Sequence, residues 1–266
     1  SSSWIKPNAP RGHSRAAEPQ GMVKRLAGFR EVTPAEAGLP SAPFEVLREA
    51  TRKDRRLQSL PGVAHVVLYR GQCVFSQAEG WADRGRRARF GFDTLCKLHG
   101  CTKPLVSAAF LTLVDAGKVR LSDPVAKHVR FADRVAVGSG GRARPVKTRA
   151  RLRDLLTMTA GLGYEDTEAY AAIMQKIRSG DIADLAGLCD ALADLPLVSE
   201  PGGRYHYSFA TDVLGRVCEE VSGMRLDKFL EHSLLRPLGM KDTHFVVPPR
   251  KRQRAAVLYR ASPADA

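Results

Sequence analysis

Long apolar runs are missing from this 266-residue sequence. The clearest one, 105–114, is about half as long as the ~20 residues that a membrane-spanning helix needs. We therefore expect a soluble protein with no transmembrane helix. The first 20 residues hold no apolar segment of the secretory type and no acid before Glu18. We predict that residues 1–21 form a disordered basic extension, whose bias weakly resembles that of an organelle transit segment.

Cysteine patterns of metal sites and redox pairs are absent as well. The sequence has five cysteines but no Cys-x-x-Cys pair, and its seven histidines are scattered. We therefore expect no metal and no cofactor. Reduced, mostly buried thiols are the simplest interpretation, and they favour an intracellular compartment. The cysteines are Cys73, Cys96, Cys101, Cys189 and Cys218.

Positive charge is in excess, with 42 Lys and Arg against 28 Asp and Glu, a net charge of +14. Arginines cluster at 84–89, 142–153 and 250–254. Such segments can bind nucleic acid or another polyanion. No aromatic residue is interleaved with them to stack on bases, so solvated loops are the favoured interpretation and nucleic-acid binding is kept as an unlikely alternative.

The apolar pattern predicts an α+β chain. Residues 62–69 and 72–80 are β-prone and are separated by Arg70-Gly71, which predicts a two-residue hairpin turn. We expect polar loops at 81–94 and 138–144. The sheet part is assigned to about 22–98 and a mainly helical part to about 99–245. The predicted helices are 42–56, 152–158, 168–177, 182–193, 211–221 and 226–235.

One further helix has the strongest pattern. Leu105, Ala109 and Leu113 repeat every four residues, and the pattern ends at Gly117. Proline is tolerated only in the first turn of a helix, so Pro104 marks its start. Residues 100–103 are therefore expected at the helix N-terminus.

Six segments that occur in order over about 32–259 together resemble class C β-lactamases, DD-peptidases and the related carboxylesterases. The resemblance implies an α/β part with an antiparallel sheet beside a helical part, with the active site between them. The segments are VTPAEAGL, PGVAHVVLYRGQ with GWADR, TKPLVSAAFLTLVDAGKVRLSDPV, LRDLLTMTAGLGY, PLVSEPGGRYHYSFATDVLGRVCEEVSG and LRPLGMKDTHF.

The family's chemistry is acyl transfer through a serine, which a lysine three residues later and a tyrosine help to activate. Residues i and i+3 share one helix face, so such a serine and lysine can meet. By resemblance, Lys103 and Tyr207 occupy the lysine and tyrosine positions, and Ser208 and Phe209 continue the tyrosine motif as binding residues. Phe209 replaces the asparagine common in lactamases, which favours the esterase branch. Gly100 occupies the serine position and cannot be acylated.

The leading hypothesis is therefore a catalytically impaired hydrolase homologue, a pseudoenzyme that could still bind a small ester, amide or peptide-like ligand. The alternative is an active esterase or amidase with an unusual nucleophile. Cys101 is the candidate, although it is offset by about 100° around a helix from position 100.

Length gives a second departure from the family pattern. In the family, further strands follow the LGM phrase, and one of them carries a Lys/His-Thr-Gly motif; neither is recognised before Ala266. We therefore expect residues 22–266 to form a partial β-lactamase/transpeptidase-like domain without these strands. The hairpin would then have an open edge, which favours self-association or a partner chain.

Overall fold

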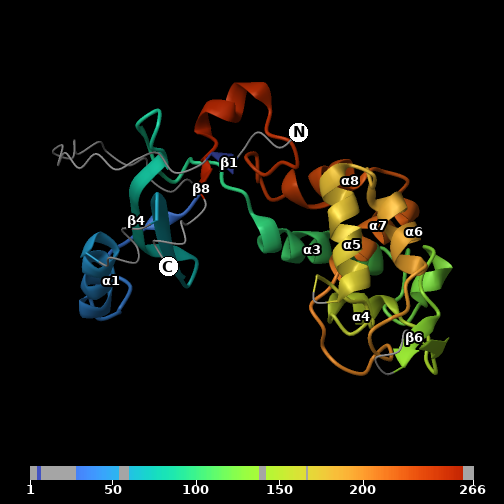
Figure 1. The fold of residues 1–266 in the computed structure, drawn as a ribbon. Helices are drawn as coiled ribbons and strands as arrows, with labels where there is room; N and C mark the ends of the chain where they lie inside the picture. The colour runs from blue at the N-terminus through green and yellow to red at the C-terminus, as the bar shows by residue number, and fades with distance from the viewer. Residues whose placement is uncertain (1–4, 7–27, 54–59, 138–141, 166, 260–266) are drawn as a thin grey trace. The chain divides into compact units, whose positions relative to one another are not determined.

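The computed structural model describes residues 5–6, 28–53, 60–137, 142–165 and 167–259 (Figure 1). The predicted extension 1–21 lies outside the described residues, except for Ile5 and Lys6. The chain divides into two compact units. The first comprises 1–97 with 246–266, and the second comprises 98–245.

The first unit is built on the predicted antiparallel hairpin, which is confirmed as β3 (Gly62–Tyr69) and β4 (Gln72–Asp83). Its two turn residues, Arg70 and Gly71, have φ of 48° and 75°. Positive φ at both positions is what a tight two-residue hairpin turn needs, because its twist then matches that of the strands.

Helix α1 (Ala42–Lys53) packs against β4. The Phe44 ring lies 5.9 Å from the ring of Phe75, and the Arg48 guanidinium lies 5.1 Å from the same ring. The expected packing of the hairpin on a helix is therefore present. This unit also contains β1 (Ile5–Lys6) paired with β8 (Leu258–Tyr259), β2 (Arg30–Glu31) paired with β4, and the 3-10 helix η4 (Pro249–Arg254).

The predicted loop 81–94 is wrong in part. Strand β4 continues to Asp83, and a short strand β5 (Ala88–Arg89) pairs with it. Two contacts close this second turn: the Arg89 guanidinium lies 4.5 Å from the Trp81 ring, and Arg86 Nε donates to Asp83 Oδ2 at 2.6 Å. These contacts hold a polar segment in strand conformation, which composition alone does not reveal.

The second unit is mainly helical, and the predicted helices are confirmed with small shifts at their ends. Its elements are η1 (His99–Cys101), α3 (Thr102–Asp115), η2 (Val125–Lys127), α4 (Leu152–Leu156), α5 (Glu168–Ser179), α6 (Leu185–Ala193), α7 (Ala210–Ser222), α8 (Leu226–Leu230) and the π-helical turn η3 (Glu231–Leu235).

A small hairpin corrects the second predicted loop. Strand β6 (Arg134–Val137) pairs with β7 (Arg142–Pro145), so Arg142 to Arg144 are in a strand, while 138–141 lie outside the described residues. The backbone amide of Ala136 also donates to the Leu197 carbonyl, which ties the hairpin to the segment after α6.

Helix α7 is the centre of the second unit. It packs against α3, α4, α6 and α8, and Leu214, Val217 and Cys218 on it are fully buried. On α3, Phe110 is fully buried in the same core. The first turn of α3 and the N-terminus of α7, which carry the predicted site residues, are therefore set by the packing of these two helices.

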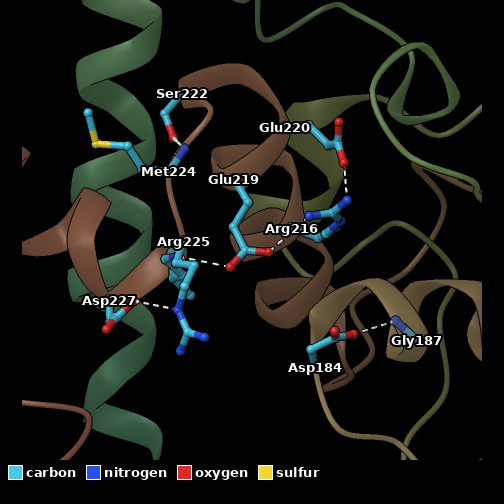
Figure 2. A network of polar contacts seen from close by, with 10 residues as sticks. Asp184, Gly187, Arg216, Glu219, Glu220, Ser222, Met224, Arg225 and Asp227 are labelled. Atoms are coloured by element: carbon cyan, nitrogen blue, oxygen red, sulfur yellow. Dashed lines mark hydrogen bonds and ion pairs between the residues drawn. The ribbon is translucent and has the colours of Figure 1, made fainter.

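A polar network fixes the other end of α7 (Figure 2). Arg216 forms ion pairs with Glu219 and Glu220, and Glu219 accepts a 2.9 Å hydrogen bond from the backbone amide of Leu226 at the start of α8. The network thus joins α7 to α8. In the part of the chain that the structure describes, no helix is long and apolar enough to cross a membrane.

Candidate functional site

The start of α3 carries the first two site positions. Gly100 lies in η1 and is exposed, and Lys103 lies in the first turn of α3 and is half-buried. The backbone of Gly100 is outside the left-handed region that favours glycine. A Cβ added to Gly100 would meet only one atom within 4 Å, the Tyr207 Oη at 4.0 Å. Position 100 therefore has room for a side chain, and that side chain would face Tyr207.

Tyr207 completes the predicted group. It precedes α7 and is 43% exposed, so part of its side chain is accessible to solvent. The Lys103 Nζ lies 4.9 Å from the centroid of the Tyr207 ring, in cation–π geometry. Residues predicted from two distant segments, Lys103 and Tyr207, thus lie in contact beside Gly100.

Behind Tyr207 lies a cluster of aromatic rings. Tyr164 meets the Tyr207 ring edge-on at 5.2 Å and 86°, and it lies 4.9 Å from Phe209. Phe209 stacks in turn on Tyr170 at 6.5 Å, and both are almost fully buried. Burial raises the pKa of Tyr164, as does nearby Tyr207, while Lys103 lowers it. The core therefore supports the Tyr207 ring through Tyr164.

Ser208 and Phe209 are each 2% exposed. The Ser208 hydroxyl accepts from the backbone amide of Ala210 at 3.3 Å and lies 3.8 Å from the Met158 sulfur. Both side chains therefore point into the second unit and shape the turn that presents Tyr207. Their predicted role in ligand binding stays a prediction.

Two residues of this group, Tyr164 and Asp212, are not among those predicted from the sequence. Asp212 lies in the first turn of α7, where burial raises its pKa and the Lys103 charge lowers it. Tyr164 ends the GLGY phrase of the resemblance, and Asp212 follows Tyr207 within its motif. Those phrases are the only sequence signal for either residue, because neither has a spacing typical of a catalytic pair.

The cysteines divide by environment. Cys73, Cys189 and Cys218 are buried, as expected for most of them, and burial raises the pKa of Cys189 and Cys218 to about 12. Cys101 is exposed and directly follows Gly100. Its backbone is helical, with φ −67° and ψ −9°, so its side chain is turned away from that of position 100.

The Arg-rich segments lie in both units and make contacts within the chain. Arg144 forms an ion pair with Glu200, and the Arg254 Nε donates to the Asp93 carbonyl. These contacts leave fewer guanidinium groups for a nucleic acid. Among the described residues, no group of three or more His, Cys, Asp or Glu side chains could hold a metal ion.

Comparisons with known proteins extend this picture. Residues 47–266 match the family model described as Beta-lactamase. The chain is 33% identical over 213 residues to Protein Rv1367c of Mycobacterium tuberculosis, which covers 77% of this chain and 53% of that protein. It is also 33% identical over 230 residues to Esterase EstB of Burkholderia gladioli, covering 84% and 56%.

A solved structure shares the fold. EstCE1, described as a hydrolase with promiscuous acyltransferase activity, has a TM-score of 0.64 and 26% identity, covering 80% of this chain and 54% of that one. The chain spans about half the length of the curated relatives it matches. The fold is thus a partial β-lactamase-type fold, as predicted.

Proposed function

Because this chain belongs to the β-lactamase family, whose members similar to it include hydrolases and acyltransferases, we propose that it binds an ester or amide ligand beside Lys103 and Tyr207. We propose further that it is impaired in covalent acyl transfer. One observation carries the proposal. The side-chain position of residue 100 faces the Tyr207 hydroxyl at 4.0 Å, and glycine offers no atom there that can be acylated.

The chemistry of the remaining groups supports this division between binding and catalysis. A hydroxyl group attacks a carbonyl only when a neighbouring group takes its proton. The 4.0 Å between a Cβ at position 100 and the Tyr207 Oη supports that role for Tyr207. The Lys103 ammonium over the Tyr207 ring would stabilise negative charge that develops on the phenol oxygen. Both groups are present without the nucleophile they would serve.

Esters are the favoured ligand class. Esterase EstB and the hydrolase EstCE1 are two similar proteins whose names state hydrolysis, other relatives are named as acyltransferases, and Phe209 departs from the lactamase motif. The exposed parts of Tyr207 and of Tyr205, two residues earlier, offer apolar surface for an acyl chain.

The test is to restore the nucleophile. The natural protein and Gly100→Ser are compared on p-nitrophenyl acetate and on a chromogenic cephalosporin, with intact mass used to detect an acyl adduct. We expect Gly100→Ser to gain on the order of 10³-fold in ester hydrolysis, since covalent nucleophiles contribute at least that much. It should also carry the adduct.

Two further variants make the test specific. Gly100→Ala fits the same space without a nucleophile and should gain nothing, and Lys103→Ala added to Gly100→Ser should remove the gain. The proposal fails if the natural protein is itself acylated. If Cys101→Ala then abolishes that adduct, the Cys101 alternative replaces it.

A further inference from the structure

The glycine at position 100 differs from the glycines that this fold requires. Gly161 has φ of 84°, and a Cβ there would lie 2.3 Å from the Ser199 carbonyl oxygen. A Cβ on Gly163 would lie 2.7 Å from the Tyr170 ring. Gly100 has neither restriction. Its lack of a side chain therefore serves no need of the backbone or of packing, and it leaves accessible space beside Tyr207.

The space beside position 100 is open, because Gly100 is exposed and a Cβ there would meet only the Tyr207 hydroxyl within 4 Å. A water molecule or a short alcohol can therefore reach the place that a serine hydroxyl would take. The Cβ position lies 4.0 Å from Tyr207 Oη. An oxygen atom one bond length beyond that position can approach Oη at about 2.7–2.8 Å, the usual distance of an O–H···O hydrogen bond. Water and short alcohols meet both conditions.

We propose that a small hydroxylic molecule, water or a short alcohol, occupies the side-chain space of Gly100 and attacks a bound ester directly. The reaction is then a single displacement with no acyl-enzyme. This inference rests on the proposed function, because it uses the same ester site, and it assigns to that site a second substrate class and a different reaction course.

The step balances without any oxidant or cofactor. The oxygen of the water or alcohol forms a bond to the ester carbonyl carbon, and the bond from that carbon to the leaving alkoxide breaks. The attacking hydroxyl gives its proton to Tyr207 Oη as the phenol gives its own proton to the leaving alkoxide. Tyr207 is unchanged at the end, and the Lys103 ammonium 4.9 Å from its ring centroid stabilises the charge that passes through it.

The experiment measures alcoholysis by the purified natural protein. p-Nitrophenyl acetate is supplied with increasing methanol, and methyl acetate and acetate are separated by NMR. We expect p-nitrophenol release and methyl acetate formation to rise with methanol and to be weaker with the bulkier 2-propanol. No acetyl adduct should appear in the intact mass.

Three variants test whether methanolysis uses the side-chain space of Gly100. Gly100→Ala fills it with a methyl group and should lower methyl acetate formation by about tenfold or more, a small share of what a positioned reactant contributes. Gly187→Ala is the matched control. It adds the same methyl group on α6, where the nearest atom would be 3.5 Å away, and should leave the rate unchanged. Tyr207→Phe should lower methanolysis in the same way as Gly100→Ala.

The outcomes separate the two proposals. If Gly100→Ala forms methyl acetate as fast as the natural protein, or if the natural protein carries an acetyl adduct, the inference is wrong. If Gly100→Ser is acylated and active while the natural protein shows no alcoholysis above the Gly100→Ala level, the inference fails and the proposed function stands. If Gly100→Ser remains inactive and unacylated, the proposed function fails, and the inference that rests on it fails with it.

Discussion

The two units of this chain differ in the size of their buried apolar cores. In the second unit, 98–245, one continuous core runs from Val106 to Leu235 and includes several fully buried side chains. In the described part of the first unit the buried apolar side chains are few and lie mainly on β4, among them Val74 and Phe75, while Leu60, Val66 and Leu68 remain 41–48% exposed. The candidate site therefore lies in the unit that is stabilised by its own packing, and its geometry depends on how α3 meets α7.

The largest expected effect on stability comes from removing an aromatic ring from the core of the second unit. Phe110→Ala takes away a fully buried side chain between α3 and the helices around it and should lower the free energy of unfolding by about 3–5 kcal/mol. Urea unfolding followed by far-ultraviolet circular dichroism measures it, because the second unit holds most of the helix. Leu111→Ala, at an exposed position on the same helix, is the control and should cost far less.

Tryptophan fluorescence shows whether the units are independent. Trp81, the tryptophan among the described residues, belongs to the first unit. If Phe110→Ala shifts the fluorescence transition as much as the dichroism transition, the two units unfold together, and the contrast between their cores has no thermodynamic meaning.

A second prediction sharpens the contrast between required glycines and position 100. Gly161→Ala forces a side chain into a left-handed conformation and against the Ser199 carbonyl, so we expect a loss of about 1–3 kcal/mol. Gly100→Ala should change stability by less than about 0.5 kcal/mol, as ordinary surface substitutions do. Thermal unfolding of both variants compares them, and equal losses would show that Gly100 is structural after all.

Sequence patterns predicted the structural features that are set by residues close together along the chain. The Arg70-Gly71 turn and the place of Pro104 in the first turn of α3 are local features, and both are confirmed. Strand β5 was not predicted, although it pairs with the end of β4 across a short turn and the Arg89 guanidinium lies 4.5 Å from the Trp81 ring. A composition that is typical of a loop does not reveal such a contact.

The site residues also fall into two groups, those assigned from the sequence and those found only in the structure. Lys103, Tyr207 and Gly100 could be assigned only through motif resemblance, and the structure places them together. Tyr164 and Asp212 belong to the group through ring packing and burial. Tyr164 lies between α4 and α5, and Asp212 lies on α7. These properties arise only when the segments fold together, so no spacing in the sequence encodes them.

A third prediction uses the charge of the site. Burial raises the pKa of Asp212 from its ordinary value of 3.8, with Lys103 opposing the shift. The folded state then holds this proton more tightly than the unfolded state, so stability is lost as the pH rises from about 3.8 through the raised pKa. Asp212→Asn removes that loss. We expect the variant to gain stability relative to the natural protein at neutral pH but not below pH 3.8.

Urea unfolding of both proteins at the two pH values measures this difference. Asp212→Glu keeps an ionisable carboxyl and should keep the pH dependence. If the stability difference between Asp212→Asn and the natural protein is the same at both pH values, burial of this carboxyl does not govern its protonation, and its connection to Lys103 is weakened.

The smallest expected effect on stability lies in the first unit. In the sheet order β2-β4-β3, strand β3 is outermost, and among the described residues its second edge pairs with no strand. Val66→Lys and Leu68→Lys on this exposed strand should each change stability by less than about 0.5 kcal/mol.

Charged residues on an edge strand oppose pairing with another chain. If this strand mediates self-association, sedimentation velocity should show a shift to monomer. Val46→Lys on α1 introduces the same charge at an exposed apolar position away from the strand and should not shift the distribution. If all three variants sediment like the natural protein, the apolar side chains left exposed in the first unit do not form an association surface, and the predicted pairing at its edge is wrong.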